Sequence, residues 1–242
     1  MTPTLSDDAL IAGLTCGEIE LQGQFTRGYN YTFLVNIRCE GREIPAVYKP
    51  LKGEQPLWDF PENTLAGREV AAYLVSQALG FGVVPPTVLR ADGPFGPGSF
   101  QQYIEYNPNY NYFTFKPADL ERLRPLALFD LLVNNADRKG GHIIVQKRTR
   151  HLYGIDHGLC FHVENKLRTV VWDFAGEDIP PELLLPLERF RSALTGSLAA
   201  QLQPYLSPEE IAALTARAEG LLAAGKFPLP PEDRRSYPYP PL

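Results

Sequence analysis

Part of the first hundred residues alternates apolar and polar positions with the period of a β-strand. In the stretch 17–38, apolar side chains flank a turn at residues 23–28, and after the turn they recur at every second position. The recurring residues are Tyr29, Tyr31, Phe33, Val35 and Ile37. Side chains two positions apart lie on one face of a strand, so the pattern predicts two strands joined by the turn. Further short apolar runs predict strands at residues 44–50, 83–89 and 98–106.

Other segments repeat apolar residues with the period of a helix. The main ones are residues 64–79, 126–133, 181–200 and 207–224, and a shorter one covers residues 5–14. Asn63 or Thr64 is the expected cap of the first of these, and Gly80 marks its end. The strand-rich part is separated from the helix-rich part by a polar connector at residues 106–116. This order predicts an α+β fold.

The stretch 126–162 carries the chemistry. Its helix leads into a polar loop at 134–142, which is followed by a strand at 143–145, a basic turn and a second strand at 151–155. That second strand delivers Asp156-His157-Gly158. Helix, polar loop, hairpin and Asp-x-Gly is the order in which kinase-like folds hold ATP and a metal ion. One carboxylate sits in the loop beside the reacting hydroxyl, and the second binds the metal.

The wording of these motifs resembles the phosphatidylinositol 3-/4-kinase family, above all its type II 4-kinases and uncharacterised bacterial relatives. In that family the loop reads Asp-Arg-x-x-x-Asn and the second motif reads Ile-Asp-x-Gly-Leu-x-Phe. This chain has Asp137-Arg138 and, at residues 155–161, IDHGLCF. The resemblance spans about residues 20–175. It implies a two-lobed protein-kinase-like fold, with a β-rich N-lobe over 1–105, a mainly helical C-lobe over 106–228 and a Pro-rich tail over 229–242.

The resemblance also implies roles for single residues. Asp137 would orient the acceptor hydroxyl or accept its proton, and Asp156 would bind the metal ion at the phosphates. Arg138 would hold the loop or the segment that follows Asp156. Lys49, at the end of a predicted strand, would pair with the nucleotide phosphates, and Glu69 of the next helix would fix Lys49 there. The donor would be ATP, with Mg²⁺ or Mn²⁺.

Two further parts of a nucleotide site follow from position alone. The turn before Lys49 contains Thr26 and Gly28, and such a turn can lay backbone N–H groups against phosphates. The strand at 98–106 stands where kinases place the hinge between the lobes. Its backbone is expected to bond the adenine edge, through Gln102, Tyr103, Ile104 and Glu105.

The position five residues after Asp137 departs from the family pattern. The family has a metal-binding Asn there, whereas this chain has His142. Imidazole suits softer ions such as Mn²⁺ better than Mg²⁺, which prefers oxygen ligands. Three interpretations stay open: His142 binds the metal ion, it contacts a phosphate, or the second metal site is lost. As a metal ligand, His142 should lose activity through the ordinary histidine range, about pH 6–7.

The composition argues against some classes of binding partner. The formal net charge is −5 without a strongly basic block, which argues against nucleic acid as a partner. An acidic balance also disfavours adsorption to an anionic membrane. No run of about 18 apolar residues occurs, so no membrane span is expected. The three cysteines form no metal or disulfide pattern, and we expect a cytoplasmic protein.

The sequence therefore predicts a phosphotransferase that moves a phosphoryl group from ATP to a hydroxyl of a protein or small metabolite. The net charge ranks a lipid acceptor lower. Nucleotidyl transfer also stays open, because related loops occur in nucleotidyl-transferring relatives. The alternative is a pseudokinase that binds nucleotide and acts by association.

Overall fold

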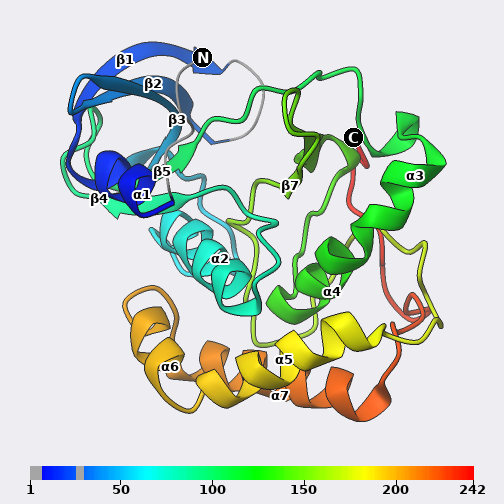
Figure 1. Cartoon of the computed structure of the whole chain (residues 1–242). Helices are drawn as coiled ribbons and strands as arrows, with labels where there is room; N and C mark the ends of the chain where they lie inside the picture. The colour runs from blue at the N-terminus through cyan, green and yellow to red at the C-terminus, as the bar shows by residue number, and fades with distance from the viewer. Residues whose placement is uncertain (1–6, 26–29) are drawn as a thin grey trace.

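The computed structural model describes residues 7–25 and 30–242, which form two lobes (Figure 1). The N-lobe is built on an antiparallel sheet with the strand order β1-β2-β3-β5-β4. Its strands are β1 (Glu18–Phe25), β2 (Thr32–Cys39), β3 (Arg42–Pro50), β4 (Thr87–Arg90) and β5 (Gly98–Gln102). Helix α1 (Asp7–Cys16) packs on the sheet, and α2 (Leu65–Leu79) lies between the sheet and the C-lobe.

The alternation of β2 buries one of its faces. Phe33, Val35 and Ile37 are at most 8% exposed and pack with Tyr48 of β3 and Leu14 of α1. The edge strand β1 leaves nearly all of its side chains exposed. The N-lobe core therefore lies between the sheet and α1, and the opposite face of β3 is left to face α2.

Helix α2 begins at Leu65 without the cap that the sequence predicts. The side chain of Thr64 makes no cap hydrogen bond to the helix. The free N–H groups of Leu65 and Ala66 instead donate to the carboxylate of Glu54, at 3.2 and 2.9 Å. A negative charge at a helix N-terminus is stabilising, so Glu54 replaces the expected cap. The predicted end at Gly80 is confirmed, since Gly80 has φ 68°.

The C-lobe is mainly helical. Its elements are α3 (Pro117–Leu120), α4 (Arg124–Val133), β6 (Ile143–Val145), β7 (Leu152–Gly154), α5 (Pro181–Ala193), α6 (Ser197–Leu202) and α7 (Pro208–Ala224). Single 3-10 turns of this lobe lie at Tyr112–Thr114, Glu121–Leu123 and Gly140–His142, and another follows β3 of the N-lobe at Leu51–Gly53. Strands β6 and β7 form the short hairpin predicted beside the polar loop.

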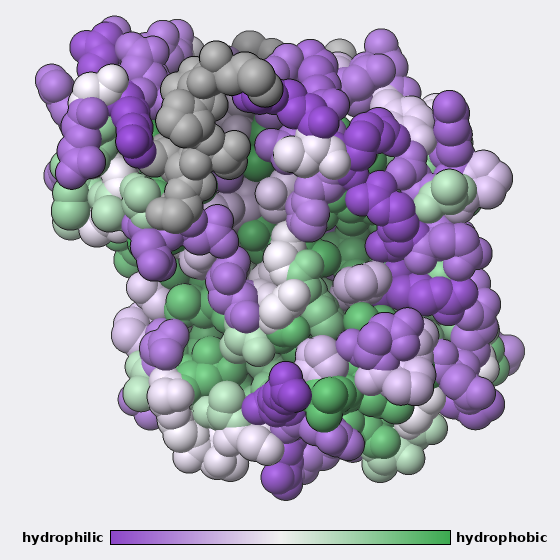
Figure 2. Space-filling view, in the orientation of Figure 1, coloured by the Kyte–Doolittle hydropathy of each residue, from purple (hydrophilic) through white to green (hydrophobic). Residues whose placement is uncertain are grey.

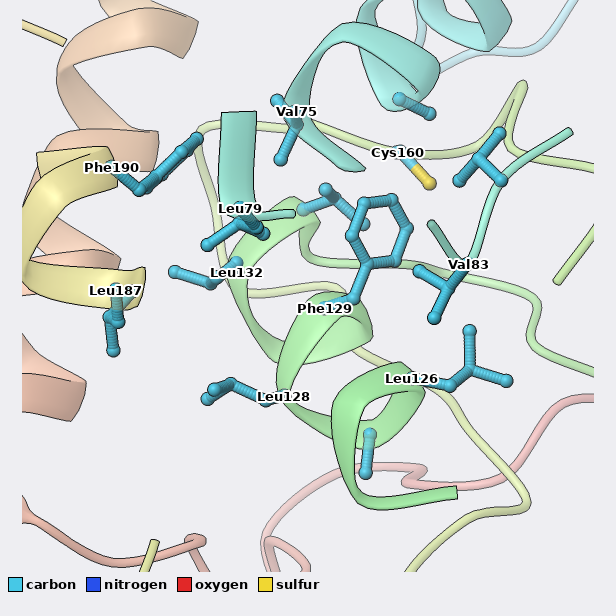
Figure 3. Packing of buried hydrophobic residues seen from close by; sticks show 14 of the residues in the cluster. Val75, Leu79, Val83, Leu126, Leu128, Phe129, Leu132, Cys160, Leu187 and Phe190 are labelled. Carbon is cyan, nitrogen blue, oxygen red and sulfur yellow. The ribbon is translucent and has the colours of Figure 1, made fainter. Parts of the chain in front are cut away.

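One large core joins α2 to the C-lobe. Phe129 of α4 projects into its centre, with Val75 and Leu79 of α2 and Phe190 of α5 around it (Figure 3). Burial of a large apolar side chain contributes about 1.5–3 kcal/mol, so this core anchors α2 firmly. Figure 2 shows hydrophilic residues along the upper and right margins of this face of the molecule. More hydrophobic residues lie over its lower half.

Three predicted elements differ from the observed ones. The helix predicted over 181–200 is two helices, because Gly196 adopts a non-helical conformation with φ −145° and ψ −124°. The strand predicted over 83–89 begins only at Thr87, after two prolines that restrict φ and lack an N–H. The strand predicted over 98–106 ends at Gln102, so residues 103–105 lie outside the sheet.

Candidate active site

Segments far apart in the sequence meet between the lobes. Lys49 follows Tyr48 on β3 and therefore points to the face opposite the N-lobe core. Its Nζ donates to Oδ1 of Asp156 at 2.8 Å and to Oε1 of Glu69 on α2. The predicted partners Lys49 and Glu69 are thus brought together, with Asp156 beside them.

Lys49, Glu69 and Asp156 form a triad in which the charge of each residue shifts the pKa of the others. Burial lowers the pKa of Lys49, but the Asp156 and Glu69 carboxylates outweigh burial, so this pKa is raised. The charge of Lys49 holds the pKa of Asp156 well below its usual range. Burial raises the pKa of Glu69, and Lys49 reverses this, so the Glu69 pKa is lowered. At neutral pH, one cation faces two carboxylates, and the triad carries a net negative charge.

Asp156 is held in position by the backbone around it. It follows β7 and adopts a left-handed conformation, with φ 63°. The carbonyl of Ile155 before it accepts from Arg138 Nη1 at 2.7 Å, and the N–H of His157 after it donates to Glu69 Oε2 at 3.0 Å. Its carboxylate stays half-exposed, with 50% of the side chain accessible. The left-handed turn therefore leaves the Asp156 carboxylate partly open to solvent beside Lys49.

Asp137 lies in the loop between α4 and β6. Its N–H donates to Asn135 Oδ1 at 2.9 Å, and its Oδ2 lies 3.0 Å from Lys139 Nζ. Burial raises the pKa of Asp137, and Lys139 opposes that shift. A carboxylate with a raised pKa is better suited to accept a proton than a fully solvated one. Lys139 was given no role from the sequence, although its position two residues after Asp137 was visible.

Arg138 lies beneath this loop and is shielded from solvent. Its side chain is 0% exposed, and its Nε and Nη2 donate to the two Asp130 carboxylate oxygens at 2.8 and 2.9 Å. Its Nη1 donates to the carbonyls of Ile155 and His142. Asp130 also accepts from Asn135 Nδ2 at 3.1 Å. Arg138 was predicted to hold the loop or the segment after Asp156, and its burial supports that role rather than direct contact with the reacting groups.

His157 connects the buried Arg138 to the triad. Its Nε2 lies 2.7 Å from Arg138 Nη2, which can only donate, so the imidazole hydrogen is on Nδ1. Within the described part of the chain, that Nδ1 is buried without a hydrogen-bond partner, and it lies 3.7 Å from Glu69 Oε2. Burial lowers the pKa of His157, so its ring is neutral. His157 therefore packs as a polar link between the loop and α2.

His142 faces Asp156 with a free lone pair. Its Nδ1 lies 3.1 Å from the Asp137 carbonyl, which can only accept, so Nδ1 carries the hydrogen. Its Nε2 lies 3.3 Å from Asp156 Oδ2. Burial lowers the pKa of His142 to about 4, and the nearby cations Arg138, Lys139 and Lys49 add to this. At neutral pH, an imidazole nitrogen and a carboxylate oxygen face each other without a proton between them, and this pair fits a divalent cation.

The predicted adenine-binding backbone has some of its groups already committed. The N–H of Gln102 donates to Pro86 O and the N–H of Tyr103 to Pro45 O. The carbonyl of Glu105 accepts from Lys147 N–H, and its side chain pairs with Lys147 Nζ at 2.6 Å. Ile104 is buried at 3% exposure. Thr26 and Gly28, the predicted phosphate-covering residues, lie outside the described residues.

The described residues offer only part of a metal site. Among residues 7–25 and 30–242, no three His, Cys, Asp or Glu side chains converge as a complete ligand set. His142 and Asp156 are a pair that phosphate oxygens and water would have to complete. Within the same part of the chain, no helix is both long and apolar enough to cross a membrane.

Comparisons with known structures agree with the fold. The structure of hydra Fam20 with sugar superposes with a TM-score of 0.55 at 14% identity, covering 90% of this chain and 87% of that one. The Helicobacter pylori proinflammatory kinase CtkA gives a TM-score of 0.53 at 12% identity, covering 88% and 94%. At such identities the likeness shows the fold alone. The predicted two-lobed, kinase-like α+β fold is confirmed.

Sequence comparisons give the family. Residues 64–194, more than half of the chain, match the family described as phosphatidylinositol 3- and 4-kinase. Protein Rv2133c of Mycobacterium tuberculosis is 40% identical over 272 residues, covering 98% of this chain and 96% of its own. Phosphatidylinositol 4-kinase gamma 4 of Oryza sativa subsp. japonica is 30% identical over 135 residues, covering 48% and 24%. The chain belongs to the phosphatidylinositol 3- and 4-kinase family, as the motifs around Asp137 and Asp156 predict.

Proposed function

We propose that this protein is an ATP-dependent phosphotransferase that moves the γ-phosphoryl group to a hydroxyl of a protein or small metabolite. Family membership and the kinase-like fold support a kinase-like phosphotransferase. The observation that carries the finer proposal is the meeting of Lys49, Glu69, Asp156 and His142 in one cluster beside Asp137. Phosphoryl transfer requires mainly such positioning and charge neutralisation.

Each residue of the cluster has a distinct task in the proposal. Lys49 neutralises phosphate charge, and Glu69 holds it in place from a rigid helix. Asp137 orients the acceptor hydroxyl and takes its proton. Lys139 keeps Asp137 in place and adds positive charge where the transferred group would pass. Arg138 and Asp130 hold the loop from beneath.

The donor set of the cluster fits a divalent ion. The unprotonated Nε2 of His142 and the half-exposed carboxylate of Asp156 would hold it, 3.3 Å apart as they stand. A bound ion would supply charge neutralisation at the phosphates. Because one ligand is an imidazole nitrogen, Mn²⁺ is better matched to this pair than Mg²⁺.

The acceptor is proposed from charge. A net charge of −5 disfavours adsorption to an anionic lipid surface, so a protein or small-metabolite hydroxyl ranks above a lipid. The comparisons do not favour the pseudokinase alternative. The presence of both carboxylates, Asp137 and Asp156, supports a phosphotransferase over a pseudokinase.

Calorimetry with ATP and Mn²⁺ or Mg²⁺ tests the nucleotide site. Lys49→Ala and Asp156→Ala should each weaken binding at least tenfold, because each removes a charge that the phosphates or the metal ion require. Lys52→Ala is the matched control, since Lys52 is an exposed lysine of the same segment. Binding by both site variants at the wild-type level would refute the assignment.

Transfer is tested with labelled ATP against proteins, small alcohols and phosphoinositides. Label on a protein or small alcohol supports the proposed acceptor class. Turnover of phosphatidylinositol alone would replace it with a lipid. Nucleotide binding without label transfer to any acceptor, or to the protein itself, with either metal would identify a pseudokinase. Transfer of an α-phosphate label would identify nucleotidyl transfer.

A further inference from the structure

The last ten residues of the Pro-rich tail, 233–242, bind the catalytic loop through their main chain, and this part is called the tail below. The carbonyl of Pro241 accepts from Gly140 N–H at 2.8 Å. The carbonyl of Ser236 accepts from Thr169 N–H at 3.0 Å and from Trp172 Nε1 at 3.2 Å. In Figure 1, the end of the tail lies near α3, on the C-lobe. The tail thus runs from the segment after Asp156 back to the loop that carries Asp137.

The segment between the tail and the loop is itself bonded to both. The N–H of Arg138 donates to Arg168 O at 3.0 Å, and the N–H of Val170 donates to Arg138 O at 3.1 Å. Thr169, between these two residues, is the one that donates to Ser236. The catalytic loop, residues 168–170 and the tail therefore lie side by side, joined by backbone hydrogen bonds.

The groups that the tail satisfies are buried. Thr169 is 4% exposed, and Gly140 is buried. A buried backbone N–H without an acceptor costs free energy comparable to a lost hydrogen bond, so these two groups need the tail or an equivalent. A Cβ placed on Gly140 would lie 2.6 Å from the Phe113 ring, so this ring packs closely against the glycine. Gly140 therefore contacts both Phe113 and the carbonyl of Pro241.

Side chains fix the tail along its length. Arg234 donates from Nη1 to Leu167 O at 3.2 Å and from Nη2 to Asn165 Oδ1 at 2.8 Å. Pro238 is buried, and the Arg235 guanidinium lies over the Tyr239 ring within the tail, at 5.1 Å. Prolines limit the conformations that the tail would lose on docking, which favours a fixed course over a fluctuating one.

We propose that the tail is a positioning element of the catalytic loop, which fixes Asp137 for the transfer step without taking part in nucleotide binding. Gly140, which the tail binds, is three residues after Asp137. The nucleotide residues Lys49, Glu69 and Asp156 are held by β3, α2 and the turn after β7. The proposal rests on the proposed function only where transfer is the quantity measured.

The test compares the full chain with a chain ended after Glu232. Amide hydrogen exchange should become at least tenfold faster at Gly140 and Thr169. It should stay unchanged at Tyr103, whose N–H donates to Pro45 O at 2.9 Å in the N-lobe, away from the loop and the tail. The rate of transfer at saturating ATP should fall at least tenfold, while calorimetric ATP affinity stays within twofold. A peptide of residues 233–242, added in trans, should slow the exchange again and restore transfer, and a scrambled peptide should not.

A milder variant covers the case in which the shortened chain does not fold. Arg234→Ala removes the two guanidinium bonds to the segment 165–167, and it should speed exchange at Gly140 and lower the transfer rate about threefold. Glu232→Ala, an exposed residue just before this stretch, should leave both unchanged. Unchanged Gly140 exchange in the shortened chain or in Arg234→Ala would overturn the proposal, as would ATP affinity falling in step with the transfer rate. If the full chain transfers nothing, the proposed function fails, and the exchange rates still decide about the tail.

Discussion

Two charged clusters lie next to each other in this protein and differ in how completely their charges are paired. The scaffold cluster is Asp130, Asn135, Arg138 and His157. The reactive cluster is Lys49, Asp137, His142 and Asp156. Arg138 and Asp130 are at most 1% exposed and bind each other through two hydrogen bonds. Asp156 is 50% exposed, and its Oδ2 faces an unprotonated imidazole nitrogen.

The contrast separates support from chemistry. A buried ion pair whose hydrogen bonds are nearly all made holds one geometry, and it leaves little affinity for a ligand. A cluster with excess negative charge and facing lone pairs is stabilised by binding a cation. Changes in the scaffold cluster should therefore act on stability, and changes in the reactive cluster should act on binding and transfer. The predictions below test that division, from the largest effect to the smallest.

The largest expected effect is on transfer. Asp156→Asn removes the half-exposed carboxylate that would bind the metal ion, and it leaves Lys49 with one carboxylate instead of two. Transfer should fall by about 10³-fold or more, as expected for losing a main electrostatic contact in phosphoryl transfer. The free energy of unfolding, measured with urea, should change by less than about 1 kcal/mol because the side chain is half-exposed.

The matched control is Asp178→Asn, a carboxylate that is 82% exposed and paired with Lys226. It should leave both transfer and stability at wild-type values. Transfer by Asp156→Asn within tenfold of the wild type would contradict the division between the two clusters.

The second prediction concerns the scaffold cluster, where we expect stability to change. Arg138→Met leaves Asp130 as a buried, unpaired carboxylate, and this should lower the free energy of unfolding by about 3–5 kcal/mol in urea denaturation. Arg191→Met breaks an exposed pair with Glu219 and should cost no more than about 1 kcal/mol. The double variant Arg138→Met with Asp130→Leu should regain part of the loss, since no charge is then left unpaired. Wild-type stability of Arg138→Met would contradict the scaffold role.

The sequence could predict the reactive cluster because its order is the order of the fold. A strand-end lysine, a helix glutamate and two carboxylates around a hairpin are recognisable in Lys49, Glu69, Asp137 and Asp156. The scaffold cluster was harder to predict. Nothing in the spacing of Asp130 and Arg138 shows that both side chains turn inwards, because that depends on how α4 packs.

Contacts made by the main chain could not be predicted from the sequence. Ser236 and Pro241 bind the loop by their carbonyls, which every residue carries, so the docking of the tail has no side-chain signature. The same holds for the predicted adenine-binding backbone, where the Tyr103 N–H donates to Pro45 O instead. His142 was visible as a departure from the family pattern, but its pKa depends on burial that only the fold provides.

The third prediction concerns pH. Burial lowers the pKa of His142 from 6.5 to about 4, so the unfolded chain takes up a proton before the folded one does. The contribution of this residue to stability is therefore complete above pH 6.5 and is lost as the pH falls towards 4. With about 1.4 kcal/mol for each pKa unit, the loss is at most about 3 kcal/mol. The loss of activity that the sequence predicts at about pH 6–7 should therefore occur near pH 4.

His142→Asn isolates that contribution. Urea denaturation at pH 7, 5.5 and 4.5 without metal should show a smaller acid destabilisation than in the wild type. The remainder comes in part from His157, whose pKa burial also lowers. In transfer assays, His142→Asn should shift preference from Mn²⁺ towards Mg²⁺ because an amide oxygen is a harder ligand. An unchanged pH dependence and metal preference would leave His142 as a structural residue.

The smallest expected effect lies outside both clusters, at the start of α2. Glu54→Ala removes the carboxylate that accepts from Leu65 and Ala66 N–H, and it should cost about 1 kcal/mol of stability, as for loss of a helix cap. Because α2 carries Glu69, loosening its first turn should also raise the KM for ATP slightly, about twofold, while the rate at saturation is kept. Glu62→Ala, an exposed carboxylate beside the same helix, is the control. A loss of several kcal/mol would place Glu54 with the scaffold cluster, and a large fall in the saturated rate would place it with the reactive one. The modest value is expected because the core around Phe129 anchors most of α2 independently of its cap.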